Sequence, residues 1–168
     1  MSQLAVYGIA IAFGFVAWGF VTAHYIWPVL RGRSSADALR PLLLLHCFRF
    51  IGLAFVVPGV VSPDLPAAFA SPAAYGDLVA AVFALLALAA GPHTKLGIAL
   101  VWVFNFWGTG DLLYAFYQGN RVGLEPGQLG ATYFIVIVLV PLLLITHGLV
   151  FRLLLRGNVV EAEPGGTR

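Results

Sequence analysis

Three histidines lie inside the long apolar segments of this sequence, and their side chains could bind a haem or a metal ion. His24, His46 and His147 each stand in a different apolar run. A b-type haem needs two imidazoles, one on each side of the ring, and three imidazoles suit zinc or copper. We therefore predict these histidines as candidate ligands of haem b or of a metal ion. The plainer interpretation is three amphipathic side chains that reach the membrane surface.

Arg49 is the charged residue that is hardest to explain in an apolar segment. It follows His46 by three residues, so both side chains project from one face of a helix. A guanidinium binds a carboxylate through two parallel hydrogen bonds, which suits an acidic ligand such as a haem propionate. A structural role is the alternative, with Asn105 as a partner. We predict four ligand-binding residues: Arg49, Asn105, Trp102 and Asp111.

The composition of the chain defines the elements that must position these residues. Of its 168 residues, 61% are hydrophobic and 10% are charged, whereas about a quarter are charged in an average soluble domain. A helix needs about 20 apolar residues to cross the hydrocarbon core. We predict an all-α membrane protein with one domain, residues 1–156, and a polar, disordered tail at 157–168. The five transmembrane helices are expected at 4–30, 41–61, 73–90, 96–117 and 130–155.

Prolines determine several of these predicted boundaries. Pro41 is expected at the first helical position, and Pro72 in the loop before helix 73–90. Asp77 then falls in the first turns of that helix, where a carboxylate complements the helix dipole. Pro141 lies inside the last helix and is expected to kink it.

The depth of each polar residue is counted from the arginine-rich helix ends at about 1.5 Å per residue. The three histidines then share one level, with Arg49 and Asn105 slightly deeper. Asp77 and Asp111 form a second level, about 21 Å from the same ends. Roughly 10 Å of depth separates Asp111 from Arg49 by this count, which makes Asp111 the least favoured partner.

The lysines and arginines of the loops predict an orientation, because positive residues favour the cytoplasmic side. Six of them gather at one end of the predicted bundle: Arg31, Arg33, Arg40, Lys95, Arg152 and Arg156. Only Arg121 then lies at the other end. We therefore expect the N-terminus outside and the C-terminus in the cytoplasm, in a bacterial inner membrane.

These residues favour a ligand- or cofactor-binding bundle of haem or quinone type, active in electron transfer. Its site is expected in the inner leaflet, between the first, second, fourth and fifth helices. One alternative is a small transporter or proton-coupled carrier that uses Arg49, Asn105 and Asp111. Another is an accessory subunit of a larger membrane complex.

The expected partners are the lipid bilayer, a hydrophobic small molecule, and either further copies of the chain or a larger complex. The chain lacks a basic run that would suit nucleic acid. It also lacks the common motifs of hydrolases, metalloproteases and nucleotide-binding enzymes. No catalytic residue is assigned, and the sequence leaves open whether the protein is an enzyme.

Overall fold

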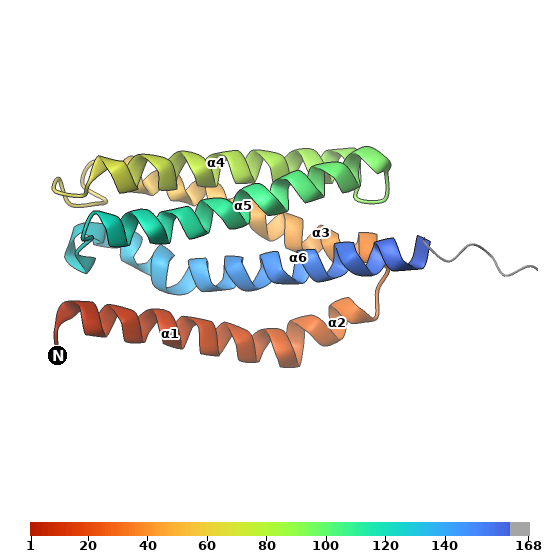
Figure 1. Ribbon diagram of the computed structural model, residues 1–168, viewed down its shortest axis with the longest axis horizontal. Coiled ribbons are helices and arrows are strands. Elements are labelled where there is room, and N and C mark those ends of the chain that lie inside the picture. The colour runs from red at the N-terminus through yellow and green to blue at the C-terminus, as the bar shows by residue number, and fades with distance from the viewer. Residues whose placement is uncertain (162–168) are drawn as a thin grey trace, which may run out of the picture.

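The computed structural model describes residues 1–161, which form a helical bundle without strands in that range (Figure 1). Five helical spans are long and apolar enough to cross a membrane: Gln3–Arg31, Ser35–Val56, Ala67–Ala90, Lys95–Arg121 and Ile135–Arg156. The prediction of an all-α bundle with five such helices is confirmed. The last helix extends to Glu161 instead of ending at 155, and the rest of the predicted disordered tail lies outside the described residues.

Several spans combine more than one kind of helix. In chain order the elements are α1 (Gln3–Val21), the π-helix η1 (Thr22–Ile26), α2 (Trp27–Arg31), α3 (Ser35–Cys47), the 3-10 helix η2 (Phe48–Val56), α4 (Ala67–Ala90), α5 (Lys95–Arg121), the 3-10 helix η3 (Pro126–Thr132), the π-helix η4 (Ile135–Leu139) and α6 (Val140–Glu161).

The two ends of the bundle differ in their connections (Figure 1). The N-terminus, the loop before α4 and the connection from α5 to α6 lie at one end, called here the N-terminal end. The α2–α3 and α4–α5 turns and the end of α6 lie at the other, called the arginine-rich end. α4 packs along α5 and against η2, while α1 packs on α6 and η4. The first helix is thus joined mainly to the last one.

The second span begins at Ser35 and not at 41, because the sequence holds an N-cap that the prediction overlooked. The Ser34 hydroxyl accepts a hydrogen bond from the Asp37 amide at 3.2 Å and donates one to its carboxylate at 2.7 Å. Such a cap satisfies backbone donors that are otherwise free at a helix start. Pro41 is therefore inside α3. A start six residues earlier moves every later residue of this helix about 9 Å further from the arginine-rich end.

The third span begins at Ala67, so the prediction of a loop at Pro72 is also wrong. Proline cannot donate to the carbonyl four residues earlier, which here belongs to Ala68. The Gln118 side chain on α5 supplies the missing donor, at 3.2 Å from that carbonyl oxygen. A partner distant in sequence thus lets the helix run through the proline. Asp77 consequently lies about three turns inside α4 and not in its first turns.

The last span does not begin at 130. Gly130 adopts φ 53°, ψ −132° inside η3, a left-handed conformation that few residues other than glycine adopt. The membrane-length helix begins at Ile135, and the π-helix η4 directly precedes α6, which contains Pro141. The Trp18 indole donates to the Val138 carbonyl at 2.9 Å. This bond fixes α1 to the irregular part of the last span.

Candidate functional site

A fully buried arginine joins two carboxylates at the centre of the bundle. Arg49 is 1% exposed. Its Nε donates to Asp77 Oδ1 at 2.7 Å, and its Nη2 donates to Asp111 Oδ2 at 2.7 Å. Nη2 also lies 2.6 Å from Asp77 Oδ1. The expectation that Asp111 is too far away is wrong, because the earlier start of α3 removes the apparent difference in depth.

The remaining guanidinium nitrogen of Arg49 connects the cluster to α5 and α6. Nη1 donates to the Gly108 carbonyl at 3.2 Å and lies 3.0 Å from Nε2 of His147. Nδ1 of the same ring is 2.7 Å from the Asn105 side-chain oxygen, and the Asn105 amide donates to the His147 carbonyl at 3.3 Å. Since Arg49 can only donate, His147 accepts through Nε2 and carries its proton on Nδ1.

His46 lies beside this cluster and is fully buried. Its Nε2 is 2.9 Å from the Thr146 hydroxyl, which itself donates to the Leu142 carbonyl at 2.8 Å. His46 is therefore the donor to Thr146. Its other nitrogen, Nδ1, has no hydrogen-bond partner among the described residues.

Three glycines on three helices make room for this charged cluster. Gly52 in η2 lies against the Asp77 carboxylate, and Gly76 in α4 lies against the Asp111 carboxylate. Gly108 in α5 lies against the rings and guanidinium of His147 and Arg49. A methyl group at any of the three would overlap these polar atoms. The 3-10 geometry of η2, with three residues per turn, also aligns Gly52 with Arg49 on its buried side.

The structure brings together only part of the site predicted from the sequence. Arg49, Asn105, Asp111 and His147 form one hydrogen-bonded cluster, His46 adjoins it, and Asp77 joins it from α4. His24 is exposed and bonds the Phe20 carbonyl of its own helix at 3.0 Å. Trp102 stacks on Phe106, with ring centroids 5.5 Å apart, and is not part of the cluster. The first helix, which was expected to supply His24, therefore contributes no residue to the cluster. α4 contributes Asp77 instead.

The packing of the histidines does not fit the expected haem or metal centre. The rings of His46 and His147 lie in contact, with centroids 4.3 Å apart, whereas the two axial ligands of a haem lie on opposite sides of the macrocycle. Both nitrogens of His147 are already hydrogen-bonded within the protein. Within the described residues, no three His, Cys, Asp or Glu side chains are placed to hold a metal ion.

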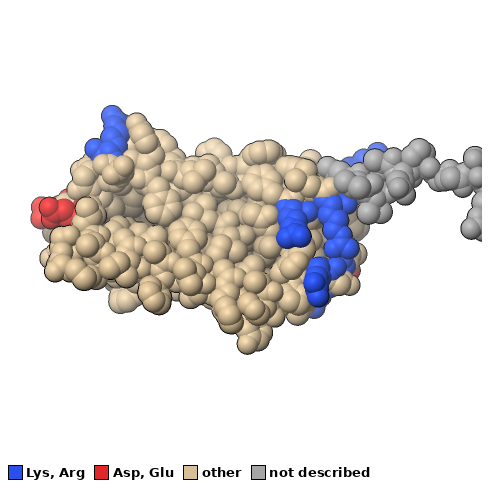
Figure 2. All heavy atoms as spheres, turned by 60° about the horizontal axis from the view of Figure 1, so that its bottom comes forward, with Lys and Arg blue, Asp and Glu red and all other residues tan. Residues whose placement is uncertain are grey.

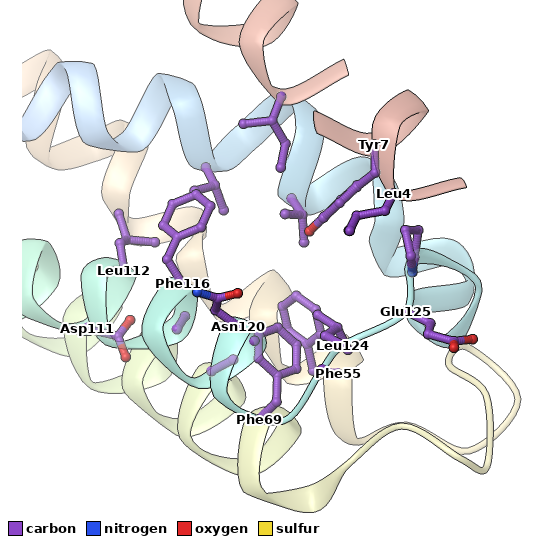
Figure 3. A pocket seen from close by; sticks show the side chains of 18 of the residues that line it. Leu4, Tyr7, Phe55, Phe69, Asp111, Leu112, Phe116, Asn120, Leu124 and Glu125 are labelled. Atoms are coloured by element: carbon purple, nitrogen blue, oxygen red, sulfur yellow. The ribbon is translucent and has the colours of Figure 1, made fainter. Parts of the chain in front are cut away.

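A cavity of about 920 Å³ begins at the two carboxylates and extends towards the N-terminal end. Asp77 and Asp111 line its deep end, with side chains 10% and 8% exposed. Figure 3 shows Asp111 at one end of the cavity, Glu125 at the other and Tyr7 directed inward from α1. The walls are mainly apolar and include the aromatic residues Tyr7, Phe55, Phe69 and Phe116. We refer to this space as the carboxylate cavity.

The fold and this site define a class: a helical bundle with five spans of membrane-crossing length, a buried ion cluster and a cavity that ends on it. Residues 6–155 match a protein family described as a domain of unknown function (DUF8737), and the chain belongs to that family. Comparisons with curated proteins and with solved structures gave no match.

Proposed function

We propose that this chain is an integral membrane protein that binds a lipid-soluble, amphipathic small molecule in the carboxylate cavity. The observation that carries the proposal is the combination of apolar walls with a polar deep end. Ligand pockets commonly have volumes of about 300–1,000 Å³ and a few convergent polar groups among apolar ones. The cavity, at about 920 Å³, falls in that range.

The charge distribution supports an orientation with the N-terminus outside and the arginine-rich end on the cytoplasmic side. Figure 2 shows most of the visible Lys and Arg at the arginine-rich end, with a smaller group near the opposite end. Such an excess favours the cytoplasmic side. The cavity then lies in the outer leaflet, in contrast to the inner-leaflet site expected from the sequence. A membrane-soluble ligand would reach it from the outer half of the bilayer.

A carrier is the second candidate function, and one feature of the second span favours it. η2, which contains Arg49, is a 3-10 helix of nine residues. Such helices seldom exceed 3–4 residues, and a 3-10 stretch within a longer helix often marks a hinge. Movement of η2 would displace Arg49 relative to the carboxylates. Binding is the step that both candidates share, and it is tested first.

Filling the cavity should abolish binding. Ala115 on α5 lines the carboxylate cavity, so a tryptophan at this position would occupy the space of the ligand. We expect Ala115→Trp to reduce binding of a fluorescent dodecyl amphiphile without a negative head group to the protein in lipid nanodiscs by at least tenfold.

The matched control is Leu113→Trp on the same helix. Leu113 is 56% exposed and does not line the cavity, so this variant should bind the probe as the wild type does. Equal binding by wild type and Ala115→Trp, after subtraction of empty nanodiscs, would contradict the proposal.

A further inference from the structure

The geometry points to a positively charged head group: the ligand of the carboxylate cavity carries a protonated amine, which binds between Asp77 and Asp111. This inference rests on the proposed binding function and adds the chemical class of the ligand. It depends on three features of the described residues. These are the sign of the charges that line the cavity, the hydrogen bonds that occupy every nitrogen of the Arg49 guanidinium, and the carboxylate oxygens that have no hydrogen bond.

The charged residues that line the cavity are all acidic. Asp77 and Asp111 both line it, and Figure 3 shows Asp111 at its deep end and Glu125 at the opposite end. No lysine, arginine or histidine is among the described residues that line it. Clefts lined by charges of one sign attract ligands of the other. The cavity therefore favours cations and disfavours fatty acids and phospholipid-like anions.

Arg49 does not offset this preference, because its guanidinium does not reach the cavity. Its side chain is 0% exposed. All three of its nitrogens are engaged by protein oxygens or by the His147 ring. An arginine binds an anionic ligand through free donors, and here no guanidinium nitrogen remains free. The deep end of the cavity thus presents hydrogen-bond acceptors to a ligand and no charged donor.

Each carboxylate lines the cavity and has one oxygen that Arg49 does not bond; Oδ2 of Asp77 lies against Gly52 and Oδ1 of Asp111 lies against Gly76. Arg49 bonds Oδ1 of Asp77 and Oδ2 of Asp111, and the other oxygen of each has no hydrogen bond to a described residue. When both carboxylates are ionised, the single guanidinium leaves one excess negative charge in the cluster. A buried charge without a partner is costly, and an ammonium group offers both the opposite charge and three donors. The aromatic walls add a favourable environment, since Tyr and Phe rings attract cations.

Three probes with the same chain length test the inference on the full protein in neutral-lipid nanodiscs at pH 7. They are dodecylamine, dodecanol and dodecanoate, which carry a positive, a neutral and a negative head. We expect dodecylamine to bind at least tenfold more tightly than dodecanol, and dodecanoate to bind more weakly than both. Empty nanodiscs correct for partition of each probe into lipid.

Asp111→Asn locates the preference. This variant leaves Arg49 paired with Asp77, so the cluster becomes neutral, and its helical content and unfolding midpoint are measured to show that it is folded. We expect it to lose most of the tenfold preference, so that dodecylamine and dodecanol bind this variant with similar affinity. Equal binding of all three probes to the wild type, or an unchanged preference in folded Asp111→Asn, would overturn the inference and leave the binding function intact. Failure of all three probes to bind would contradict the binding function itself.

Discussion

Arg49→Met is expected to lower the free energy of unfolding by about 3–5 kcal/mol, because removal of one member of a buried ion pair leaves the other charge uncompensated. Here two carboxylates, Asp77 and Asp111, would lose their common partner, and His147 would lose a donor. Methionine has a similar length and leaves little empty volume. The measurement is the unfolding equilibrium in mixed detergent micelles, followed by circular dichroism.

Two further variants separate loss of charge pairing from other effects. The triple variant Arg49→Met, Asp77→Asn, Asp111→Asn removes all three charges and should recover more than half of the lost stability. Arg121→Met is the control at a position outside the cluster, where the arginine bonds only the Gln118 side chain among the described residues, at 3.4 Å. It should change stability by less than about 1 kcal/mol. An Arg49→Met variant as stable as the wild type would show that the cluster is not an ion pair in the folded protein.

Gly108→Ala is the second change with a large expected effect, a loss of about 1–3 kcal/mol of stability, as for other overpacked cores. A methyl group there would overlap both the His147 ring and the Arg49 guanidinium. Neither neighbour can move away cheaply, because Arg49 is bonded to two carboxylates and His147 to Asn105. The same unfolding measurement tests this prediction.

Gly110→Ala is a matched control on the same helix. A methyl group at Gly110 would meet nothing within 4 Å. Alanine is favoured over glycine inside helices by roughly 0.5–1 kcal/mol, so this variant should be as stable as the wild type or slightly more stable. If Gly108→Ala is as stable to unfolding as Gly110→Ala, α5 does not pack closely against the cluster at Gly108.

The sequence was sufficient to predict the five spans because apolar length is a local property. The predicted helix bounds are wrong at two prolines. In one case a distant side chain satisfies the backbone carbonyl that the proline leaves free, and in the other an N-cap starts the helix before the proline. The sequence predicts Pro72 in the loop before a helix. The bond from Gln118, on another helix, explains why α4 instead runs through this proline. Pro41 favours a helix start in the sequence, but Ser34 and Asp37 form an N-cap that starts the helix six residues earlier.

The sequence indicates some of the residues that form the buried cluster, and their role as a ligand site stays a prediction. Intramembrane polar residues tend to face the bundle interior, and this rule identified Arg49, Asn105, Asp111 and His147. It does not determine which helices are neighbours or how each residue is rotated about its axis. The rule therefore places His24 in the site although it is exposed, and it omits Asp77 because the sequence predicts a helix that begins only after Pro72.

The cavity had no signal in the sequence. Its aromatic walls come from four separate elements, α1, η2, α4 and α5, and phenylalanine is common throughout this chain. The sequence also does not distinguish the three glycines at the cluster from the other glycines of the chain, because a close approach depends on which neighbour faces the glycine. Gly108 and Gly110 both stand just before Asp111 in the sequence, and of these two only Gly108 packs against the cluster.

The central claim is that a ligand occupies the carboxylate cavity, and photolabelling tests it most directly. Dodecylamine with a photoreactive diazirine on its chain would be irradiated with the protein in nanodiscs, and the adducts mapped by peptide mass spectrometry. We expect adducts on cavity-lining residues such as Tyr7 and Phe116, with loss of this labelling in Ala115→Trp. Labelling confined to exposed residues outside the cavity, such as Phe13 and Phe106, would contradict the account.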